Sequence, residues 1–341
     1  MKKTLATTAT TTAAAALLVG LVAAPAQAAP GFAFDQRISG PDRFATAVAA
    51  SKLLEPVDGN GTDVVVVNGY ATVDGLTASY LAGLRSAPIL YTDTGSVPAV
   101  TAAEIERLGV RDVWIVGGTD RVPQAQQDAW AAAGRTVHRI AGADRYETAA
   151  MVATADDSGD APEQVFIATG TGTADALAAG PIAWARNYPV LLTEPGTVPA
   201  ATAAALTELG TANRVVLGNA VTDAVYGQVA GTQRLAGADR QETAAKIADD
   251  AIATENFDSQ SVALVGGTDA TAADALAAAP VAGAGGVPLL FTGFDGGLGD
   301  GTSAYLTAHE GNYVSAGDGW VFGGEPSVPQ RAVDAATALV Q

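Results

Sequence analysis

The sequence predicts an α/β protein of three tandem modules, each with a parallel β-sheet that helices cover on both faces. One observation is a motif of the form Arg-Ile/Leu-x-Gly-x-Asp-Arg, which occurs three times, at residues 37–43, 139–145 and 234–240. The other is that strand-like and helix-like segments alternate after each copy, and the strand-like segments are apolar throughout. Continuous apolar strands are typical of parallel sheets that are buried on both faces.

Three further patterns recur in the same order within each module. They are an Asp-x-Leu-x-Ala segment, a Pro-x-Leu-x-Thr segment and a strand that runs into glycine. Four ordered patterns in three copies indicate that one module has been triplicated. The three patterns begin at Asp74, Asp175 and Asp274, at Pro88, Pro189 and Pro288, and at Val113, Val215 and Trp320.

Residues 1–28 are expected to be a signal peptide. Lys2 and Lys3 precede an apolar stretch at residues 13–24, and Ala26-Gln27-Ala28 fits the small-x-small rule for cleavage. The apolar stretch is too short to span a bilayer, which disfavours the alternative of an uncleaved anchor. We therefore expect a lead-in at residues 29–36 and modules at residues 37–138, 139–233 and 234–341.

Module two is the clearest example of the alternation. A capping box predicts the start of its first helix, because Asp144 can cap the helix and Glu147 lies three residues on. Gly210 is placed to end its third helix. The expected elements are a strand at residues 138–141, a helix at 144–155, a strand at 164–168, a helix from about 175, a strand at 189–193, a helix at 199–209, a strand at 214–217 and a weaker helix to about 229.

The way the modules follow one another predicts how they pack. No Ser- or Pro-rich linker separates them, so we expect them to pack tightly. Module three is not followed by another motif strand. This gives the hypothesis that each sheet is completed by the motif strand of the next module, with Arg37-Ile38 closing the ring onto module three.

The composition and the missing motifs exclude or disfavour several classes of function. The chain has no cysteine, which excludes a disulfide framework and a cysteine nucleophile. Its formal charge of −18 disfavours nucleic acid and anionic membranes as partners, because their phosphates would be repelled. Neither His138 nor His309 recurs between modules, and there is no Gly-x-Ser-x-Gly elbow, Walker loop or His-Glu-x-x-His motif. We therefore expect no enzymatic activity, no metal site and no cofactor.

The recurring Asp and Arg residues are the candidates for binding a ligand. The Asp-Arg pairs lie at strand-to-helix turns, where helix N-termini and guanidinium groups hold anions. The Asp-x-Leu-x-Ala segments begin at the carboxyl edge of each sheet, where α/β proteins bind ligands. The alternatives are a helix N-cap for each Asp and an ion pair with the neighbouring module for each motif Arg. The candidates are Arg37, Asp42, Arg43, Asp74, Arg139, Asp144, Arg145, Asp175, Arg234, Asp239, Arg240 and Asp274.

These recurring residues resemble the cell-wall-binding repeat 2 family of exported proteins of Gram-positive bacteria. The resemblance rests on the four patterns, in order, over residues 37–341. It implies three Rossmann- or toprim-like modules packed as a pseudo-threefold trimer within one monomer. Module two departs at Gly218-Asn219, where the other modules have Gly-Gly, and module three has Gln241 where module two has Tyr146.

The resemblance also implies a function. We expect a secreted protein, associated with the cell wall, that attaches non-covalently to an anionic wall glycopolymer through its three modules. Clusters of arginine or bridging divalent cations would have to offset the repulsion between this acidic chain and the polymer. Two alternatives stay open: an enzyme that acts on a wall component through Asp74, Asp175 or Asp274, and a structural surface protein that self-assembles.

Overall fold

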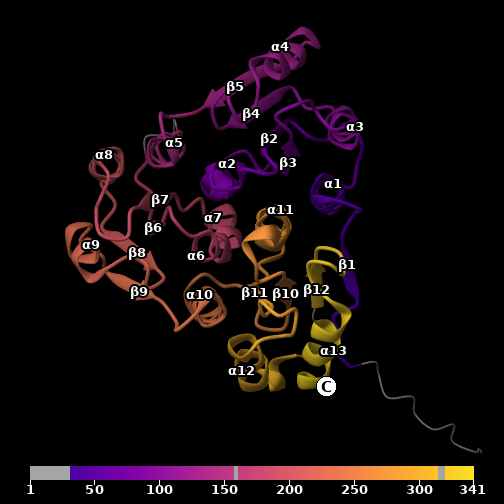
Figure 1. The fold of residues 1–341 in the computed structure, drawn as a ribbon, viewed down its shortest axis with the longest axis vertical. Coiled ribbons are helices and arrows are strands. Elements are labelled where there is room, and N and C mark those ends of the chain that lie inside the picture. The colour runs from indigo at the N-terminus through magenta and orange to yellow at the C-terminus, as the bar shows by residue number, and fades with distance from the viewer. Residues whose placement is uncertain (1–30, 157–159, 314–318) are drawn as a thin grey trace, which may run out of the picture. The chain divides into compact units, whose positions relative to one another are not determined.

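The chain forms three parallel β-sheets of four strands each, with helices around them (Figure 1). The computed structural model describes residues 31–156, 160–313 and 319–341, and at Asp74 it describes the backbone alone. The expected signal peptide, residues 1–28, lies outside the described residues. Within the described ranges, no helix combines the length and the apolar character needed to cross a bilayer. The predicted α/β class with three parallel sheets is confirmed.

All three sheets have the same strand order, and their central strands are buried on both faces. The burial explains why these strands are apolar without alternation. From one edge to the other, the sheets consist of β3 (Ile89–Thr92), β2 (Asp63–Asn68), β4 (Asp112–Val116) and β5 (Thr136–Ile140); of β7 (Val190–Thr193), β6 (Gln164–Thr169), β8 (Asn213–Leu217) and β9 (Gln233–Leu235); and of β11 (Leu289–Phe291), β10 (Val262–Val265), β12 (Gly319–Phe322) and β1 (Gln36–Ile38).

The last strand of every sheet is the motif strand of the next repeat. Strand β5 carries Arg139 and completes the first sheet, and β9 carries Arg234 and completes the second. Strand β1 pairs in parallel with β12, so that Arg37 lies beside Val321 although the two are far apart in sequence (Figure 1). The hypothesis that the first motif strand closes onto module three is therefore confirmed.

The helices follow the strands as the sequence predicts, with one correction. The expected second helix of module two is divided at Ala179 into α6 and α7, whereas the equivalent Pro280 of module three lies inside the continuous helix α11, so the proline alone does not account for the division. The helices are α1 (Arg43–Leu54), η1 (Asp74–Thr77), α2 (Ala78–Leu84), α3 (Ala99–Leu108), α4 (Gln124–Ala132), α5 (Arg145–Ala153), α6 (Ala174–Ala178), α7 (Gly180–Arg186), α8 (Ala200–Leu209), α9 (Asp223–Gln228), α10 (Arg240–Thr254), η2 (Asp269–Thr271), α11 (Ala272–Gly285), α12 (Asp300–Ala308), η3 (Glu310–Asn312) and α13 (Gln330–Leu339).

The predicted helix ends are confirmed in module two. Asp144 accepts hydrogen bonds from the N–H groups of Tyr146 and Glu147, and Glu147 in turn accepts one from Ala143 N at 2.6 Å. The N-cap half of the expected capping box is therefore confirmed, whereas Glu147 bonds to the N–H of the residue before the N-cap and not to that of Asp144 itself. Helix α8 ends at Gly210, whose φ of 64° lies in the left-handed region.

Module one lacks the second half of the capping box for a simple reason. The position equivalent to Ala143 is Pro41, which has no N–H, and the position equivalent to Glu147 is Ala45. The donor and its acceptor are therefore both missing, and no backbone group is left unsatisfied.

Helices α2, α7 and α11, one from each module, pack against one another. Five positions after the recurring Asp, the three modules have Ser79, Gly180 and Ala279. These equivalent positions meet, because a Cβ atom on Gly180 would lie 2.9 Å from the Cβ of Ala279 and 3.2 Å from the Oγ of Ser79. Small side chains at this position let the three helices approach closely.

A second set of equivalent positions combines one large side chain with two glycines. Nine positions after the recurring Asp, the three modules have Gly83, Trp184 and Gly283. A Cβ atom on Gly83 would lie 2.3 Å from the carbonyl oxygen of Trp184, and one on Gly283 would lie 3.0 Å from the indole ring. Gly283 thus leaves room for the Trp184 side chain, and Gly83 lets α2 approach the backbone of α7.

We predict that Gly83→Ala lowers the free energy of unfolding by about 1–3 kcal/mol. The new methyl group would collide with the backbone of α7, and the gain in helix propensity of about 1 kcal/mol is too small to offset this. Thermal or chemical unfolding measures the effect. Gly196→Ala is the matched control, since no heavy atom lies within 4 Å of its Cβ position. Equal stability of the two variants would contradict close packing at Gly83.

We also predict that a chain shortened to begin at residue 39 loses stability mainly in module three. The deletion removes β1 and leaves the edge of β12 unpaired. Limited proteolysis should then cut residues 234–341 before residues 139–233. Undiminished protease resistance of module three would show that closure by β1 contributes little.

Candidate functional site

The first arginine of each motif holds the end of the preceding sheet. Arg37 donates from Nη1 to the carbonyl oxygens of Gly323 (2.8 Å) and Val328 (3.0 Å), which follow β12. Because these contacts fix the loop after the strand, we interpret this arginine as structural. Arg139 makes the same contacts with Gly117 and Val122, and Arg234 makes them with Gly218 and Val221.

The motif aspartates cap the helices that follow them. Asp42 accepts from Ala45 N at 2.8 Å, and Asp239 accepts from the N–H groups of Gln241 and Glu242 at 2.9 Å. With Asp144, all three therefore satisfy donors at a helix N-terminus. The capping interpretation of these three residues is confirmed, whereas their role in binding a ligand stays a prediction.

The second arginine of each motif crosses to the loop after the first strand of its own module's sheet. Its Nη1 donates to a glycine carbonyl: Arg43 to Gly69 (2.7 Å), Arg145 to Gly170 (2.6 Å) and Arg240 to Gly267 (2.8 Å). One hydrogen bond orients the guanidinium and leaves most of its five donors for other partners. These arginines therefore differ from the first set, which are held by two carbonyls each.

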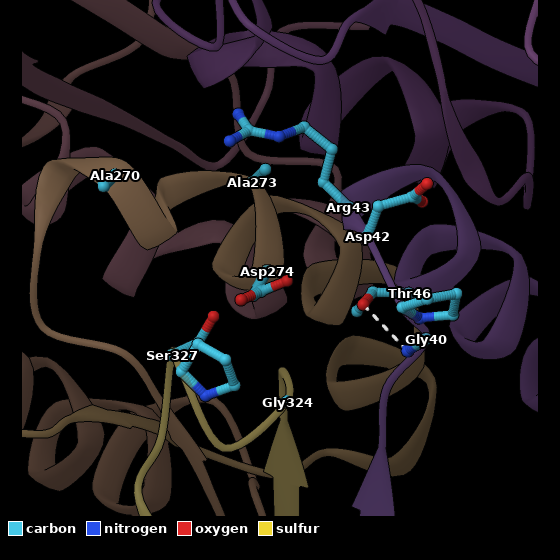
Figure 2. Close-up of a pocket in the computed structure, with 11 residues that line it drawn as sticks. Gly40, Asp42, Arg43, Thr46, Ala270, Ala273, Asp274, Gly324 and Ser327 are labelled. Carbon is cyan, nitrogen blue, oxygen red and sulfur yellow. Dashed lines mark hydrogen bonds between the residues drawn. The ribbon is translucent and has the colours of Figure 1, made fainter.

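A pocket of about 140 Å³ lies where the motif of module one meets module three, and we call it the 3–1 pocket. Figure 2 shows Asp274 in its middle, between Ser327 and Thr46, while the carboxylate of Asp42 points away. The pocket thus combines the cationic turn of one module with a buried carboxyl of another. Its lining is Gly40, Pro41, Asp42, Arg43, Thr46, Ala270, Ala273, Asp274, Gly324, Pro326 and Ser327.

An equivalent pocket of about 370 Å³ lies between modules two and three, and we call it the 2–3 pocket. Arg240 takes the place of Arg43, and Asp175 takes the place of Asp274. Asn219, which replaces the second glycine in module two, donates to the carbonyl of Gly237 at 2.7 Å. The departure from Gly-Gly therefore adds a hydrogen bond across the boundary. The remaining lining residues include Thr169, Thr171, Gly172, Thr173, Ala220, Ala238, Asp239 and Thr243.

Asp175 and Asp274 do not cap helices, which corrects the alternative that the sequence allowed for them. Each lies in the first turn of its helix, and the N-cap positions are Thr173 and Thr271. Glycine makes room for both carboxyls, because a Cβ on Gly218 would lie 1.9 Å from Asp175 Oδ2. The glycine that recurs directly after β8 and β12 is therefore explained by the space that the carboxyl needs. Asp74, the equivalent in module one, is the first residue of η1.

Burial changes the electrostatics of these carboxyls. Asp274 is 6% exposed, and desolvation raises its pKa above the ordinary value, while a hydrogen bond from Ser327 and the charge of Arg43 oppose the shift. Desolvation likewise raises the pKa of Asp175, against the charge of Arg240. The charged form of each carboxyl is therefore less favourable here than in water.

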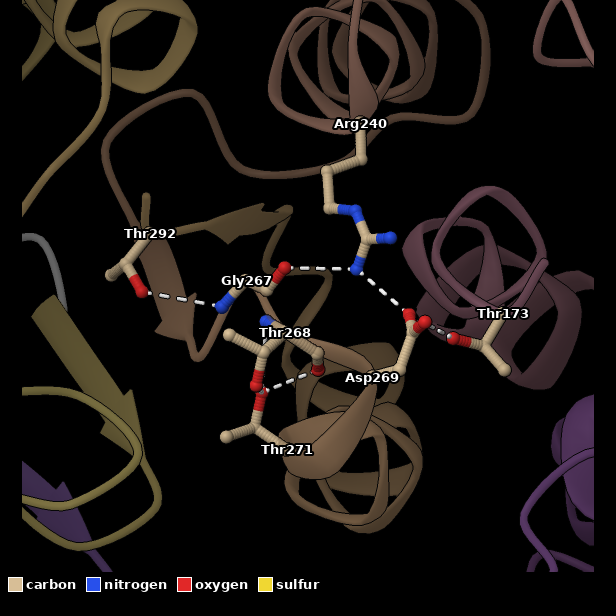
Figure 3. A network of polar contacts seen from close by, with 7 residues as sticks. All are labelled: Thr173, Arg240, Gly267, Thr268, Asp269, Thr271 and Thr292. Carbon is tan, nitrogen blue, oxygen red and sulfur yellow. Dashed lines mark hydrogen bonds and ion pairs between the residues drawn. The ribbon is translucent and has the colours of Figure 1, made fainter. Parts of the chain in front are cut away.

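A polar network connects two residues that line the 2–3 pocket, Arg240 and Thr173, with Asp269 of η2 (Figure 3). Arg240 donates from Nη1 to Asp269 Oδ1 at 3.0 Å, and Thr173 of module two donates to the same oxygen at 3.3 Å. Asp269 begins η2, and the next residue, Ala270, lines the 3–1 pocket. Within η2, Asp269 thus contacts residues of the 2–3 pocket, and Ala270 lines the 3–1 pocket. The alternative of an ion pair with the neighbouring module is wrong for Arg240, because its partner Asp269 belongs to the same module.

Other titratable groups offer little for chemistry. Both ring nitrogens of His309 are engaged, by Asp249 Oδ1 at 3.1 Å and by the carbonyl of Tyr305 at 2.8 Å. His138 bonds to Asp112 at 2.9 Å and stacks on Trp114. Among the residues that the structure describes, no group of three or more His, Asp or Glu side chains could hold a metal ion.

Sequence reasoning did not select Ser327, Thr46 or Asn219. Thr46 could have been found, because a Thr recurs three residues after the second arginine of each motif and accepts from the motif glycine, as from Gly40 N at 3.1 Å. Ser327 and Asn219 have no recurring counterparts. Only the folded chain brings them to the pockets.

Comparison with known proteins gives a consistent result. The family model for Cell wall binding domain 2 (CWB2) matches residues 37–127, 139–227 and 234–333. The N-acetylmuramoyl-L-alanine amidase LytC of Bacillus subtilis (strain 168) is 32% identical over 214 residues, which are 62% of this chain and 42% of that protein. The Amidase enhancer of the same organism is 29% identical over 221 residues, which are 63% of this chain and 29% of that protein.

Two solved structures share the fold. Cwp8 from Clostridium difficile has a TM-score of 0.77 and 26% identity, and the match covers 89% of this chain and 51% of that one. Cwp6 from the same organism has a TM-score of 0.76 and 27% identity, with coverage of 90% and 48%. This chain therefore spans less than half of the two curated relatives and about half of the two solved structures.

We predict that Asp274→Asn stabilises the protein at pH 7. Because the folded-state pKa of Asp274 is raised, the folded state favours the proton, and stability from this group is lost as the pH rises through that pKa. The variant removes this loss, and its advantage should shrink as the pH falls toward the ordinary Asp value of about 3.9. Unfolding at several pH values measures the difference. The exposed Asp128→Asn is the control, and a difference that does not change with pH would contradict the assignment.

Proposed function

The chain belongs to the Cell wall binding domain 2 family. On that premise, we propose that it is a secreted protein that binds non-covalently to the cell wall. The observation that carries the proposal is the pair of equivalent pockets at the module boundaries, each with a motif arginine. The proposed attachment requires no catalysis by this chain. No cofactor is part of the proposal.

We propose an anionic wall glycopolymer as the partner. Arg43 and Arg240 supply guanidinium donors that suit phosphate or carboxylate groups, since such pairs are charge-assisted and often bidentate. Asp175 and Asp274 would oppose an anion when charged, and their raised pKa values make the charged form less favourable than that of an exposed Asp, which reduces this opposition. The local charge of the pockets can thus differ from the net charge of −18.

Repetition of the site suits a repeating polymer. Each equivalent pocket can engage another unit of the same chain, so the later contacts are intramolecular and strengthen overall binding without new types of contact. This supports a monomer with an internal pseudo-threefold trimer as the binding unit. The packing of α2, α7 and α11 fits this arrangement.

The test is co-sedimentation of the protein with purified walls of Bacillus subtilis, before and after the covalently attached polymers are stripped. We expect binding to disappear after stripping. Binding that persists would point to peptidoglycan, and a strict requirement for divalent cations would assign part of the attraction to bridging. Concentration-dependent association without walls would favour a self-assembling protein, and turnover of wall fragments would favour an enzyme.

We predict that Arg43→Gln and Arg240→Gln each weaken wall binding about tenfold or more, because charge-assisted hydrogen bonds contribute about 1.5–3 kcal/mol. Binding isotherms on walls measure the effect, with the melting temperature as a check on folding. Lys52→Gln is the matched control, as it removes the same charge from an exposed position on α1. Equal weakening by all three variants would mean that net charge, rather than the pockets, governs binding.

A further inference from the structure

Two aromatic side chains are unusually exposed in the described part of the chain. Tyr70 is 62% exposed and Phe294 is 65% exposed, whereas the other exposed large apolar side chains there are not aromatic. The Tyr70 ring meets the buried Phe44 ring edge-on, with 5.7 Å between the ring centroids, but most of each exposed ring faces solvent, and aromatic side chains are enriched at binding surfaces. Single exposed apolar side chains are common on protein surfaces, so the significance of these two rings depends on what they contact.

Both rings stack on a motif arginine. The Cζ atom of Arg43 lies 4.5 Å from the centre of the Tyr70 ring, and that of Arg240 lies 4.6 Å from the centre of the Phe294 ring. These are the arginines that line the 3–1 and 2–3 pockets. Each pocket thus has one exposed ring beside its cationic group.

The two rings reach this place from different parts of the module. Tyr70 follows β2, while Phe294 follows β11, so they do not occupy equivalent positions. Module two has Thr171 and Pro195 at the corresponding places. Because the rings come from unrelated positions, the shared motif does not account for them.

We propose that Tyr70 and Phe294 are stacking platforms for sugar rings of the wall polymer, while the neighbouring pockets hold acidic substituents of the same polymer. This rests on the proposed function and narrows it to a partner whose saccharide rings carry anionic groups. One such subsite lies beside the 3–1 pocket and one beside the 2–3 pocket.

The chemistry of the site supports a sugar ring as occupant. A pyranose has a face of C–H groups that packs on an aromatic face, and this burial is hydrophobic and insensitive to salt. The guanidinium that lies over each ring is itself fixed by a hydrogen bond, from Arg43 to Gly69 O and from Arg240 to Gly267 O. The rings are therefore held in place before binding, which reduces the entropy lost in the complex.

The experiment uses polymer released from Bacillus subtilis walls as the probe and measures how tightly each variant binds it at low and at high salt. We expect Tyr70→Ala and Phe294→Ala each to weaken binding about fivefold, the order of one aromatic contact, by the same factor at both salt concentrations. Arg43→Gln should instead lose its effect at high salt, because charge attraction is screened.

Conservative variants show whether a loss of binding comes from loss of the aromatic ring or from a change in folding. Tyr70→Phe and Phe294→Tyr keep the ring and should bind like the unaltered protein, and Val100→Ala, which removes another exposed apolar side chain on α3, should have no effect. Undiminished binding by the Tyr70→Ala, Phe294→Ala double variant would overturn this inference alone. Equal loss in Tyr70→Phe would assign the contact to the hydroxyl and also overturn it. Failure of the unaltered protein to bind walls or polymer would overturn the proposed function and this inference together.

Discussion

The close approach of α2, α7 and α11 is the constraint on which the rest of the structure depends. Helices approach this closely only where side chains are small, and the equivalent positions Ser79, Gly180 and Ala279 meet that requirement. Where Trp184 needs space, Gly83 and Gly283 provide it. The repeats therefore differ in a coordinated way: the large side chain in module two is accompanied by glycine at the equivalent positions of modules one and three, which keeps the packing close.

This packing also places the pockets. Each central helix follows the carboxyl end of the first strand of its sheet, so bringing the helices together brings those ends to the module boundaries. There, a buried carboxyl of one module faces the motif turn of the next, as Asp274 faces Gly40 and Arg43. The residues that line each of these pockets come from two modules. Assembly of the modules is therefore what creates the candidate sites.

Much of the fold could be predicted from the sequence, because it depends on local signals that recur. Continuous apolar strands, the box of Asp144 and Glu147, and Gly210 each define an element through its own residues. The division of α6 from α7 was not predicted, and Pro181 does not signal it, because the equivalent Pro280 lies inside the continuous helix α11. The candidate site was predicted less completely. Recurrence could not separate Arg37, which is held by two carbonyls, from Arg43, which retains free donors.

Contacts between modules were the part that sequence patterns could not supply. Ser327 and Asn219 do not recur, and their importance comes from residues that lie far away in sequence. The raised pKa values of Asp175 and Asp274 have the same origin, since desolvation depends on what covers a carboxyl in the folded chain.

The pairing of β1 with β12 gives the chain a particular order of folding. A chain is made from its N-terminus, so residues 36–38 are made long before their partner, residues 319–322. The first two sheets need only strands that lie close behind one another, but the third cannot be completed until residues 319–322 have been made. Until then β1 has no sheet to join. Completion of the third sheet thus requires all three repeats to be present.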